Sequence, residues 1–219
     1  MRWTRPRIQD LQARLRAAYP EARCALDHVD PFQLVVATVL SAQCTDARVN
    51  LTTPALFAKF PDPASLAAAD LAELEGLIHS TGFFRNKAKN LQGLGMALVR
   101  NHGGRVPDNL EALAALPGVG QKTANVVLAS AFGIPALPVD THVFRVARRL
   151  GLSEGNTPEK VEADLCRLFP REHWIDLHHQ IITHGRRVCD ARKPKCQECP
   201  LATICPTGSG LIPDPHHAN

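Results

Sequence analysis

The pattern of apolar and polar residues predicts helices along almost the whole chain. Between residues 84 and 101, apolar Ala88, Leu91 and Leu98 precede a glycine pair that begins at Gly103, as in an amphipathic helix with a defined end. The chain contains no convincing run of the alternating pattern typical of half-buried strands, and no internal repeat. The sequence therefore predicts an all-α fold.

Capping signals set the expected helix boundaries. Asp30 before Pro31 is typical of a helix start, and Thr157 before Pro158 is another capping residue followed by proline. Asp70 with Glu73 resembles a capping box. The expected helices cover residues 31–43, 46–59, a short segment from 63, 70–82, 84–101, 110–116, 121–132, 141–150, 158–168 and 171–188.

Composition and length favour packed helices over a β-sandwich. The chain has 219 residues, of which 45% are hydrophobic and only 5% aromatic. The longest uncharged run, residues 123–139, is shorter than the ~20 apolar residues of a membrane span. The arginine-rich N-terminus lacks the apolar stretch of a signal peptide. We therefore expect a cytoplasmic protein without a membrane partner.

The charge is mildly basic and unevenly distributed. The net charge is +4 and the pI is near 8.8. Residues 1–24 and the segment 186–195 are rich in arginine and lysine, whereas residues 62–75 are acidic. This distribution indicates a side that faces a polyanion, with an ordinary solvated surface as the alternative.

Four of the seven cysteines lie within seventeen residues near the C-terminus. They are spaced C-x6-C-x2-C-x5-C, at Cys189, Cys196, Cys199 and Cys205. A disulfide framework is a poor interpretation for a chain of this size without a secretory leader. Structural zinc usually takes two separated C-x2-4-C pairs, so the single C-x2-C with wider gaps favours an iron–sulfur cluster. Zinc and free structural cysteines remain alternatives at this point.

A glycine turn between two expected helices predicts a phosphate-binding hairpin. The segment Leu116–Ala124 reads LPGVGQKTA, with glycines that permit left-handed backbone and close approach by a ligand. The amides of the turn and of the next helix start would bind phosphate oxygens. The candidate contacts to a nucleic-acid backbone are Gly118, Val119, Gly120 and Thr123. An ordinary αα-hairpin is the alternative.

Two further residues carry candidate chemistry. Lys122 falls in the first turn of the second helix, where the macrodipole disfavours its positive charge and so favours a neutral, nucleophilic amine. Such an amine attacks a sugar carbon to form a Schiff base; the alternative role is a phosphate clamp. Asp140 precedes an expected helix and is either a simple N-cap or a carboxylate that faces a developing oxocarbenium ion.

Taken together, these segments resemble the bacterial endonuclease III family of helix-hairpin-helix DNA glycosylases, in its iron–sulfur branch. The resemblance runs in family order from about Asp30 to Cys205. It is carried by LSAQCTD, KAKNL, LPGVGQKTANVVL, VDTHVFRV, HHQIITHGRRVC and the cysteine set.

The resemblance implies a role for individual residues. Lys122 falls on the family's Schiff-base lysine, Asp140 on its essential aspartate, and the four cysteines on its [4Fe-4S] ligands. Gln43 matches the residue that fills the gap left by the extruded nucleotide. Phe83 stands where many relatives have an intercalating leucine, so the wedge is larger and aromatic, which leaves the opposite-base preference open. We expect one of Phe83 and Phe84 to be buried and the other exposed.

The resemblance also implies contacts and structural groups outside the catalytic pair. The first cysteine loop, residues 189–196, would contact DNA phosphates through Arg192, Lys193 and Lys195. His142, His178, His179 and His184 are expected to be structural.

The implied fold has two helical domains on either side of a DNA-binding cleft. One domain comprises residues 24–135, the other residues 1–23 with 136–207 around the cluster, and residues 208–219 are expected to be a disordered tail.

The implied enzyme is a bifunctional DNA N-glycosylase and abasic-site lyase. Its partner would be double-stranded DNA that contains oxidised pyrimidines or abasic sites, and the chain would act as a nucleoid-associated monomer. An adenine-mismatch glycosylase and a non-catalytic helix-hairpin-helix DNA-binding module are the alternatives. The first is disfavoured by the lysine at position 122 and the end of the chain soon after the cluster.

Overall fold

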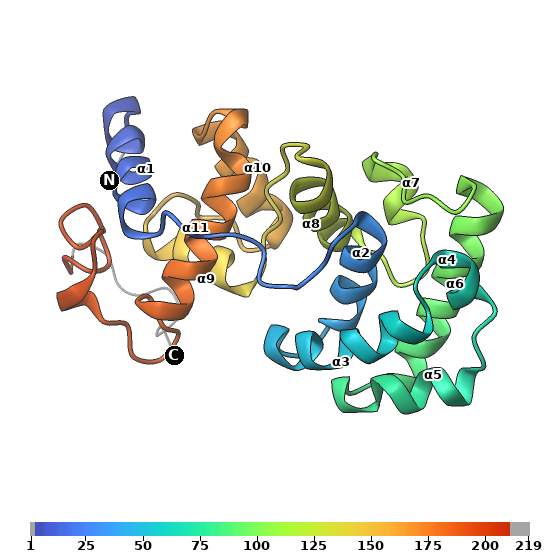
Figure 1. The fold of residues 1–219 in the computed structure, drawn as a ribbon. Helices are drawn as coiled ribbons and strands as arrows, with labels where there is room; N and C mark the ends of the chain where they lie inside the picture. The colour runs from blue at the N-terminus through green and yellow to red at the C-terminus, as the bar shows by residue number, and fades with distance from the viewer. Residues whose placement is uncertain (1–2, 211–219) are drawn as a thin grey trace. The chain divides into compact units, whose positions relative to one another are not determined.

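The structure, a computed structural model, describes residues 3–210, and within this range the regular elements are all helices (Figure 1). The α-helices are α1 (Arg5–Ala18), α2 (Pro31–Leu40), α3 (Asp46–Lys59), α4 (Pro63–Ala67), α5 (Leu71–Ile78), α6 (Phe84–His102), α7 (Leu110–Ala114), α8 (Gln121–Phe132), α9 (Thr141–Arg149), α10 (Pro158–Leu168) and α11 (Trp174–Arg187). Three 3₁₀ turns, η1 (His79–Thr81), η2 (Arg171–His173) and η3 (Cys196–Glu198), complete the described elements. The predicted all-α fold class is confirmed.

The chain forms two compact units, each with its own core. One unit is Cys24–Ile134, and the other joins the residues up to Arg23 with those from Pro135 onward. The chain thus begins in the unit that contains the C-terminal helices, crosses to the Cys24–Ile134 unit, and returns after α8.

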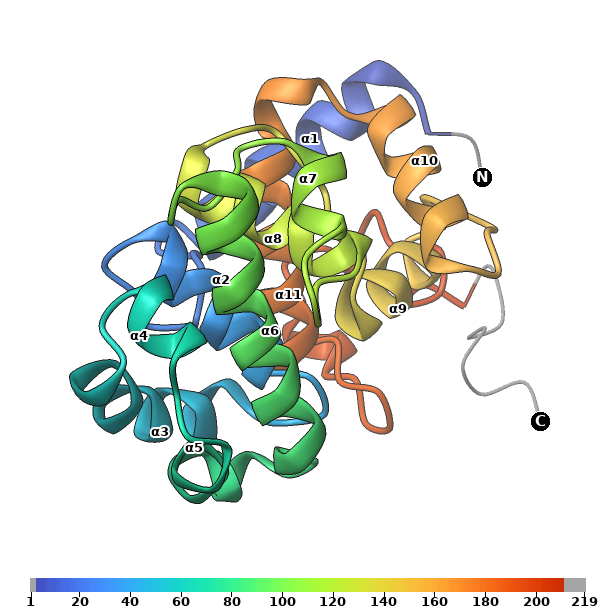
Figure 2. The same cartoon turned by 90° about the vertical axis from the view of Figure 1, so that its right-hand side faces the viewer.

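The Cys24–Ile134 unit is built around α2, α6 and α8. The segment Leu34–Leu40 of α2 is almost entirely buried, since both sides of this apolar helix pack against neighbours such as α8. Helix α4 lies against α6 (Figure 2), where a Cβ on Gly95 would come within 2.6 Å of the Ala67 amide nitrogen. A glycine is therefore required for this close approach.

The other unit packs α1, α9, α10 and α11 around an aliphatic core. Its fully buried side chains include Leu11, Val143, Leu165 and Ile181, which come from these four helices. The Trp3 indole donates to the Leu150 carbonyl at 3.1 Å and so ties the start of the chain to the end of α9.

Most expected helix boundaries are confirmed, because the capping residues act as the sequence indicates. Asp30, Thr45, Asp62, Asp70 and Thr157 all cap their helices through the side chain. Helices α8 and α10 have the expected bounds.

Several expectations about boundaries need correction. Helix α5 ends at Ile78 and not near Gly82, since the 3₁₀ turn η1 follows it, and α11 begins at Trp174 and not at Arg171, since η2 precedes it. Helix α2 ends at Leu40 and not at Gln43, which has a left-handed backbone with φ +52°. Helix α7 is capped by Asn109 and ends at Ala114, not at Leu116. The expected tail at 208–219 lies outside the described residues from 211 on, while its first residues form hydrogen-bonded turns, with the Ser209 amide donating to Cys205.

Candidate functional site

The turn between α7 and α8 is held by one left-handed glycine. Gly118 has φ +76°, and a Cβ there would lie 2.9 Å from Cβ of Asn90. Gly120, by contrast, has an extended backbone and open space around it, so only Gly118 requires a left-handed conformation. The Val119 side chain is buried and its amide already donates to the Leu116 carbonyl at 3.0 Å. Val119 therefore stabilises the turn from inside, and neither its side chain nor its amide is available to a phosphate.

The start of α8 presents uncapped amides beside an exposed lysine. Gly120 is the N-cap, so no side chain satisfies the first amides of the helix. Unsatisfied N–H groups at a helix start, together with the macrodipole, make an anion-binding position. Lys122 is exposed in this first turn and Thr123 is half-buried beside it. One turn of helix thus combines an exposed amine with backbone amides that no side chain caps.

Asp140 is the N-cap of α9, a core helix of the unit that contains α1 and α11. Its Oδ1 accepts a hydrogen bond from the Val143 amide at 2.7 Å. The cap uses one carboxylate oxygen, and the side chain is half-buried, so Oδ2 is outside the cap. A carboxylate fixed in this way keeps one oxygen for other chemistry.

Two exposed turns share an unusual backbone conformation. Within residues 3–210, Gln43 and Phe83 are the only non-glycine residues with positive φ, at +52° and +48°. Phe83 is 64% exposed and N-caps α6, whereas Phe84 is half-buried with its ring 4.4 Å from that of His79. One phenylalanine is thus solvent-facing, as expected, and the other packs only partly. A bulky residue with a left-handed backbone is strained and is often found at a functional site.

The four cysteines line a single cavity, together with Arg149 and His184. Burial raises the pKa of the Cys199 thiol to about 11 and also raises the pKa values of Cys189 and Cys205. A bound metal is what holds such thiols as thiolates.

Backbone amides donate to two of the cysteine sulfurs, as at iron–sulfur sites. The Leu201 amide lies 3.4 Å from the Cys199 sulfur, and the Gly208 amide lies 3.3 Å from the Cys205 sulfur.

Two buried arginines of α9, which the sequence analysis did not single out, anchor the first cysteine loop. Arg145 donates to the carbonyls of Gly185 and Cys189, and Arg149, only 2% exposed, donates to those of Asp190 and Ala191. Arg149 also lies 3.6 Å from the Cys189 sulfur. Their spacing of four residues places both on one side of α9, and this spacing was the available sequence signal.

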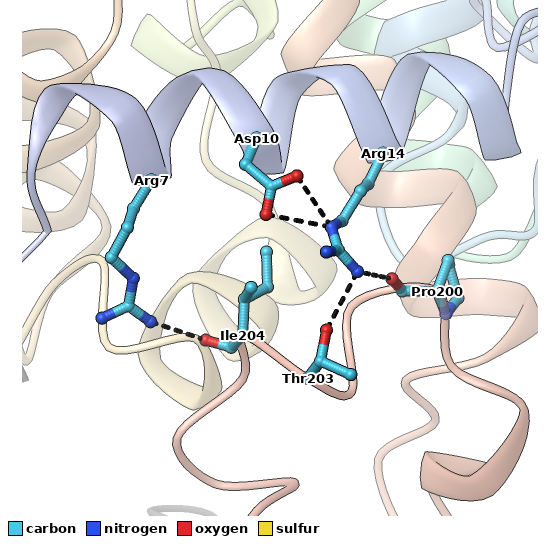
Figure 3. Close-up of polar contacts among 6 residues, drawn as sticks. All are labelled: Arg7, Asp10, Arg14, Pro200, Thr203 and Ile204. Carbon is cyan, nitrogen blue, oxygen red and sulfur yellow. Dashed lines mark hydrogen bonds and ion pairs between the residues drawn. The ribbon is translucent and has the colours of Figure 1, made fainter.

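Two arginines of α1 bind the last cysteine loop, residues 199–205 (Figure 3). Arg7 donates to the Ile204 carbonyl at 3.2 Å, and Arg14 donates to the Pro200 carbonyl at 3.2 Å and to Thr203 Oγ1 at 3.0 Å. Asp10 pairs with Arg14 at 3.0 Å. The expectation that the basic N-terminus faces a polyanion is therefore wrong for these two arginines, which bind the chain itself.

The basic side chains of the first cysteine loop are exposed on a fixed backbone. Oδ1 of Asp190 accepts from the amides of Arg192 and Lys193, which lowers the pKa of that carboxyl. The Lys195 amide donates to the Val188 carbonyl at 2.9 Å. Arg192, Lys193 and Lys195 therefore project from a structured turn.

Three histidines of α11 are buried, and His142 is half-buried at the start of α9. His184 is 1% exposed, its Nδ1 lies 2.8 Å from the Tyr19 hydroxyl, and burial lowers its pKa to about 4. His178 and His179 are buried on the same helix. His142 Nδ1 lies 3.1 Å from Arg145 at the start of α9.

Comparison with known proteins identifies the family. The model described as HhH-GPD superfamily base excision DNA repair protein matches residues 36–171. The iron-sulfur binding domain of endonuclease III matches residues 189–205, the segment bounded by the outer cysteines. The chain belongs to the HhH-GPD superfamily of base excision DNA repair proteins.

The relatives place the chain more narrowly. Endonuclease III of Synechocystis sp. is 56% identical over 194 residues, which cover 88% of this chain and 89% of the relative. The structure of a non-covalent endonuclease III–DNA complex matches with a TM-score of 0.91 at 44% identity, over 96% of this chain and 99% of that one. A trapped endonuclease III–DNA covalent intermediate matches with a TM-score of 0.90 at the same identity and coverage. Within the superfamily, the chain belongs to the endonuclease III family.

Family membership confirms the predicted enzyme class and cofactor. The chain is a base-excision DNA repair enzyme, a DNA glycosylase with abasic-site lyase activity that binds DNA. Its C-terminal cysteine segment is an iron–sulfur cluster domain. In residues 3–210, no helix combines the length and the apolar character that crossing a membrane requires.

Proposed function

We propose that this enzyme removes oxidised pyrimidines from duplex DNA and then cleaves the strand 3′ to the abasic site, with Lys122 as its nucleophile. The observation that carries this proposal is the exposed Lys122 amine in the uncapped first turn of α8. An amine is the side-chain group that forms a Schiff base with a sugar aldehyde. The neighbouring amides bind the phosphates that bring the sugar to it.

Lys122 would carry the covalent chemistry. Its Nζ attacks C1′ while the N-glycosidic bond breaks, and the bonding electrons leave with the base, which takes up a proton. Opening of the sugar ring gives an imine between Nζ and C1′. Loss of a proton from C2′ then expels the 3′ phosphate and nicks the strand, and hydrolysis of the imine returns the free lysine.

Asp140 would act at the same nucleotide as Lys122. A carboxylate near C1′ stabilises the positive charge that develops on the sugar as the base departs. The Val143 amide holds Oδ1, so the cap sets the direction in which Oδ2 points.

Gln43 and Phe83 would hold the duplex open. Extrusion of a nucleotide costs a few kcal/mol and leaves a gap in the stack. Phe83 offers an exposed ring as a wedge, and Gln43 offers an amide that fills the gap and bonds the unpaired base. A damaged, weakly stacked pyrimidine is the cheapest to extrude, which favours oxidised bases as substrates.

Backbone contacts would come from the hairpin and from the first cysteine loop. Gly118, Gly120 and Thr123 surround the uncapped helix start, and Arg192, Lys193 and Lys195 are exposed on their turn. Such contacts position a protein on DNA without reading its sequence. We further propose that residues 24–135 and residues 1–23 with 136–207 act as two functional domains, in a monomer associated with DNA in the cytoplasm.

The cluster would stabilise the cysteine loops to which it is bound. When bound to Cys189, Cys196, Cys199 and Cys205, it supplies a fixed cross-link between the two cysteine loops. Arg149 and Arg14 hold the same loops through backbone carbonyls. These contacts keep the turn with Arg192, Lys193 and Lys195 in one conformation.

Defined lesions in otherwise identical duplexes test the proposal. We expect base release and a 3′ nick with thymine glycol and with dihydrouracil, a nick alone with a bare abasic site, and no reaction with normal thymine. Adenine release from a mismatch without a nick would instead support a monofunctional adenine-mismatch glycosylase. Binding to all duplexes without reaction would support a DNA-binding module.

A further inference from the structure

A buried lysine of α6 joins the two strained turns of the Cys24–Ile134 unit. Lys87 is only 5% exposed, and its Nζ donates to the Leu40 carbonyl and to the Thr81 carbonyl, both at 2.8 Å. A lysine is rarely buried without such partners. Burial lowers the pKa of Lys87, while nearby Cys44 opposes this shift. One ammonium group thus bridges backbone segments that are 47 and 6 residues away along the chain.

Both acceptors of Lys87 are carbonyls at helix ends. Leu40 is the last residue of α2 and Thr81 is the last residue of η1. Carbonyls at the end of a helix lack partners within the helix and carry its negative dipole end, so a cation is well placed there. The Lys87 ammonium therefore binds the last carbonyl of each helix, just before the turn that follows.

The turns that follow are those of Gln43 and Phe83. Gln43 comes three residues after Leu40, and Phe83 comes two residues after Thr81. The Lys87 amide also donates to the Phe83 carbonyl at 3.1 Å, so side chain and backbone of one residue hold the Phe83 turn. Within residues 3–210, the two non-glycine residues with positive φ thus lie two or three residues beyond the carbonyls that Lys87 binds, and Gly82, before Phe83, has positive φ as well.

We propose that Lys87 is a positioning residue that fixes the Gln43 turn against the Phe83 turn, so that both side chains enter the duplex together. The inference rests on the roles of Gln43 and Phe83 in the proposed function. Wedge and gap-filler must act at one base pair, and misplacement by about 1 Å costs roughly 100-fold in rate. Lys87 does not touch the reacting atoms.

Lys87→Met tests this inference because it keeps the apolar stem and removes the three donors. Two substrates separate positioning from general stability: a thymine glycol duplex, which must be opened, and a single-stranded abasic oligonucleotide, which needs neither wedge nor gap-filler. We expect kcat/KM to fall roughly 10- to 100-fold on the duplex. On the single strand it should stay within about threefold. Lys87→Arg, which retains donors, should recover most of the duplex activity.

Two controls accompany this substrate comparison. Arg100→Met makes a similar change at an exposed position near the far end of α6 and should leave both substrates unaffected. In a Gln43→Ala, Phe83→Ala background, Lys87→Met should add less than about a twofold further loss on the duplex, because its targets are gone. If Lys87→Met does not give folded protein, Lys87→Gln replaces it throughout.

The outcomes separate the inference from the proposed function. Equal losses on both substrates, or an unchanged duplex rate, would overturn the positioning role of Lys87. An undiminished loss in the double-alanine background would overturn it as well. If the parent enzyme itself leaves the single-stranded abasic site intact, the proposed lyase chemistry of Lys122 fails, whatever Lys87 does.

Discussion

Asp140 Oδ1 accepts a hydrogen bond of 2.7 Å from the Val143 amide and thereby caps α9. The same carboxylate is the one that we propose acts on the sugar. Capping needs only an acceptor oxygen, whereas stabilisation of a sugar cation needs negative charge. The two roles of Asp140 can therefore be separated by substitution.

Asp140→Asn should retain the fold and lose the reaction. Asparagine is as good an N-cap as aspartate, so we expect the free energy of unfolding to change by less than about 0.5 kcal/mol. Excision should fall roughly 100-fold or more with the loss of the carboxylate. Asp140→Ala should lose activity and also about 1 kcal/mol of stability. Urea unfolding and single-turnover kinetics measure both; an active Asp140→Asn variant would contradict the proposed role.

The glycines of the hairpin should respond differently to alanine. Gly118→Ala forces a Cβ onto a left-handed backbone and against Asn90, so we expect a loss of about 1–2 kcal/mol. Gly120→Ala meets open space and should cost less than about 1 kcal/mol. If the Gly120 amide approaches a phosphate, this second variant should weaken DNA binding despite its stability. Unfolding curves and fluorescence anisotropy with labelled duplex test the pair.

Phe83 should be dispensable for stability but required for excision. Asparagine tolerates a left-handed backbone, and Phe83 is 64% exposed, so Phe83→Asn should leave stability unchanged or raise it by up to about 1 kcal/mol. Excision from duplex should fall roughly tenfold or more, since the wedge is gone. The adjacent Phe84→Asn removes a ring packed on His79 and should cost about 1 kcal/mol. A destabilised Phe83→Asn enzyme with full activity would argue for a structural role.

Arg149 should be essential for the cysteine loop. Arg149→Met leaves the carbonyls of Asp190 and Ala191 without these donors, and we expect a loss of about 2–4 kcal/mol together with weaker iron–sulfur absorbance. The neighbouring Arg148, whose guanidinium lies 5.5 Å from the Phe144 ring centroid, is the control. Arg148→Met should cost less than about 1 kcal/mol and keep the cluster. Equal effects of the two substitutions would show that the Arg149 contacts do not matter.

Much of the fold could be predicted because helix starts and stops are local. Thr157 with Pro158, and Gly133 after α8, fix helix ends through backbone chemistry that the residue type itself determines. The end of α2 could not be predicted in this way, because nothing in a glutamine at position 43 signals a left-handed backbone. Tertiary contacts, including the Lys87 bond to Leu40, set that turn.

The supporting contacts of the site were harder to predict than its reactive groups. Lysine, aspartate and cysteine in family motifs have recognisable chemistry, so Lys122 and Asp140 stand out in the sequence. The spacing of Arg145 and Arg149 places them on one side of α9, but only the fold shows that they are buried and bind backbone carbonyls. Burial of a long basic side chain depends on residues far away in sequence.

Borohydride trapping shows whether the Lys122 amine bonds covalently to the sugar. The enzyme is mixed with a labelled thymine glycol duplex and reduced, which fixes an imine as a stable protein–DNA adduct. Lys160→Ala, which alters an exposed lysine of α10, is the matched control. We predict an adduct with the parent and with Lys160→Ala, mapped to residue 122, and none with Lys122→Ala. An adduct of undiminished yield with Lys122→Ala, or none with the parent, would contradict the account.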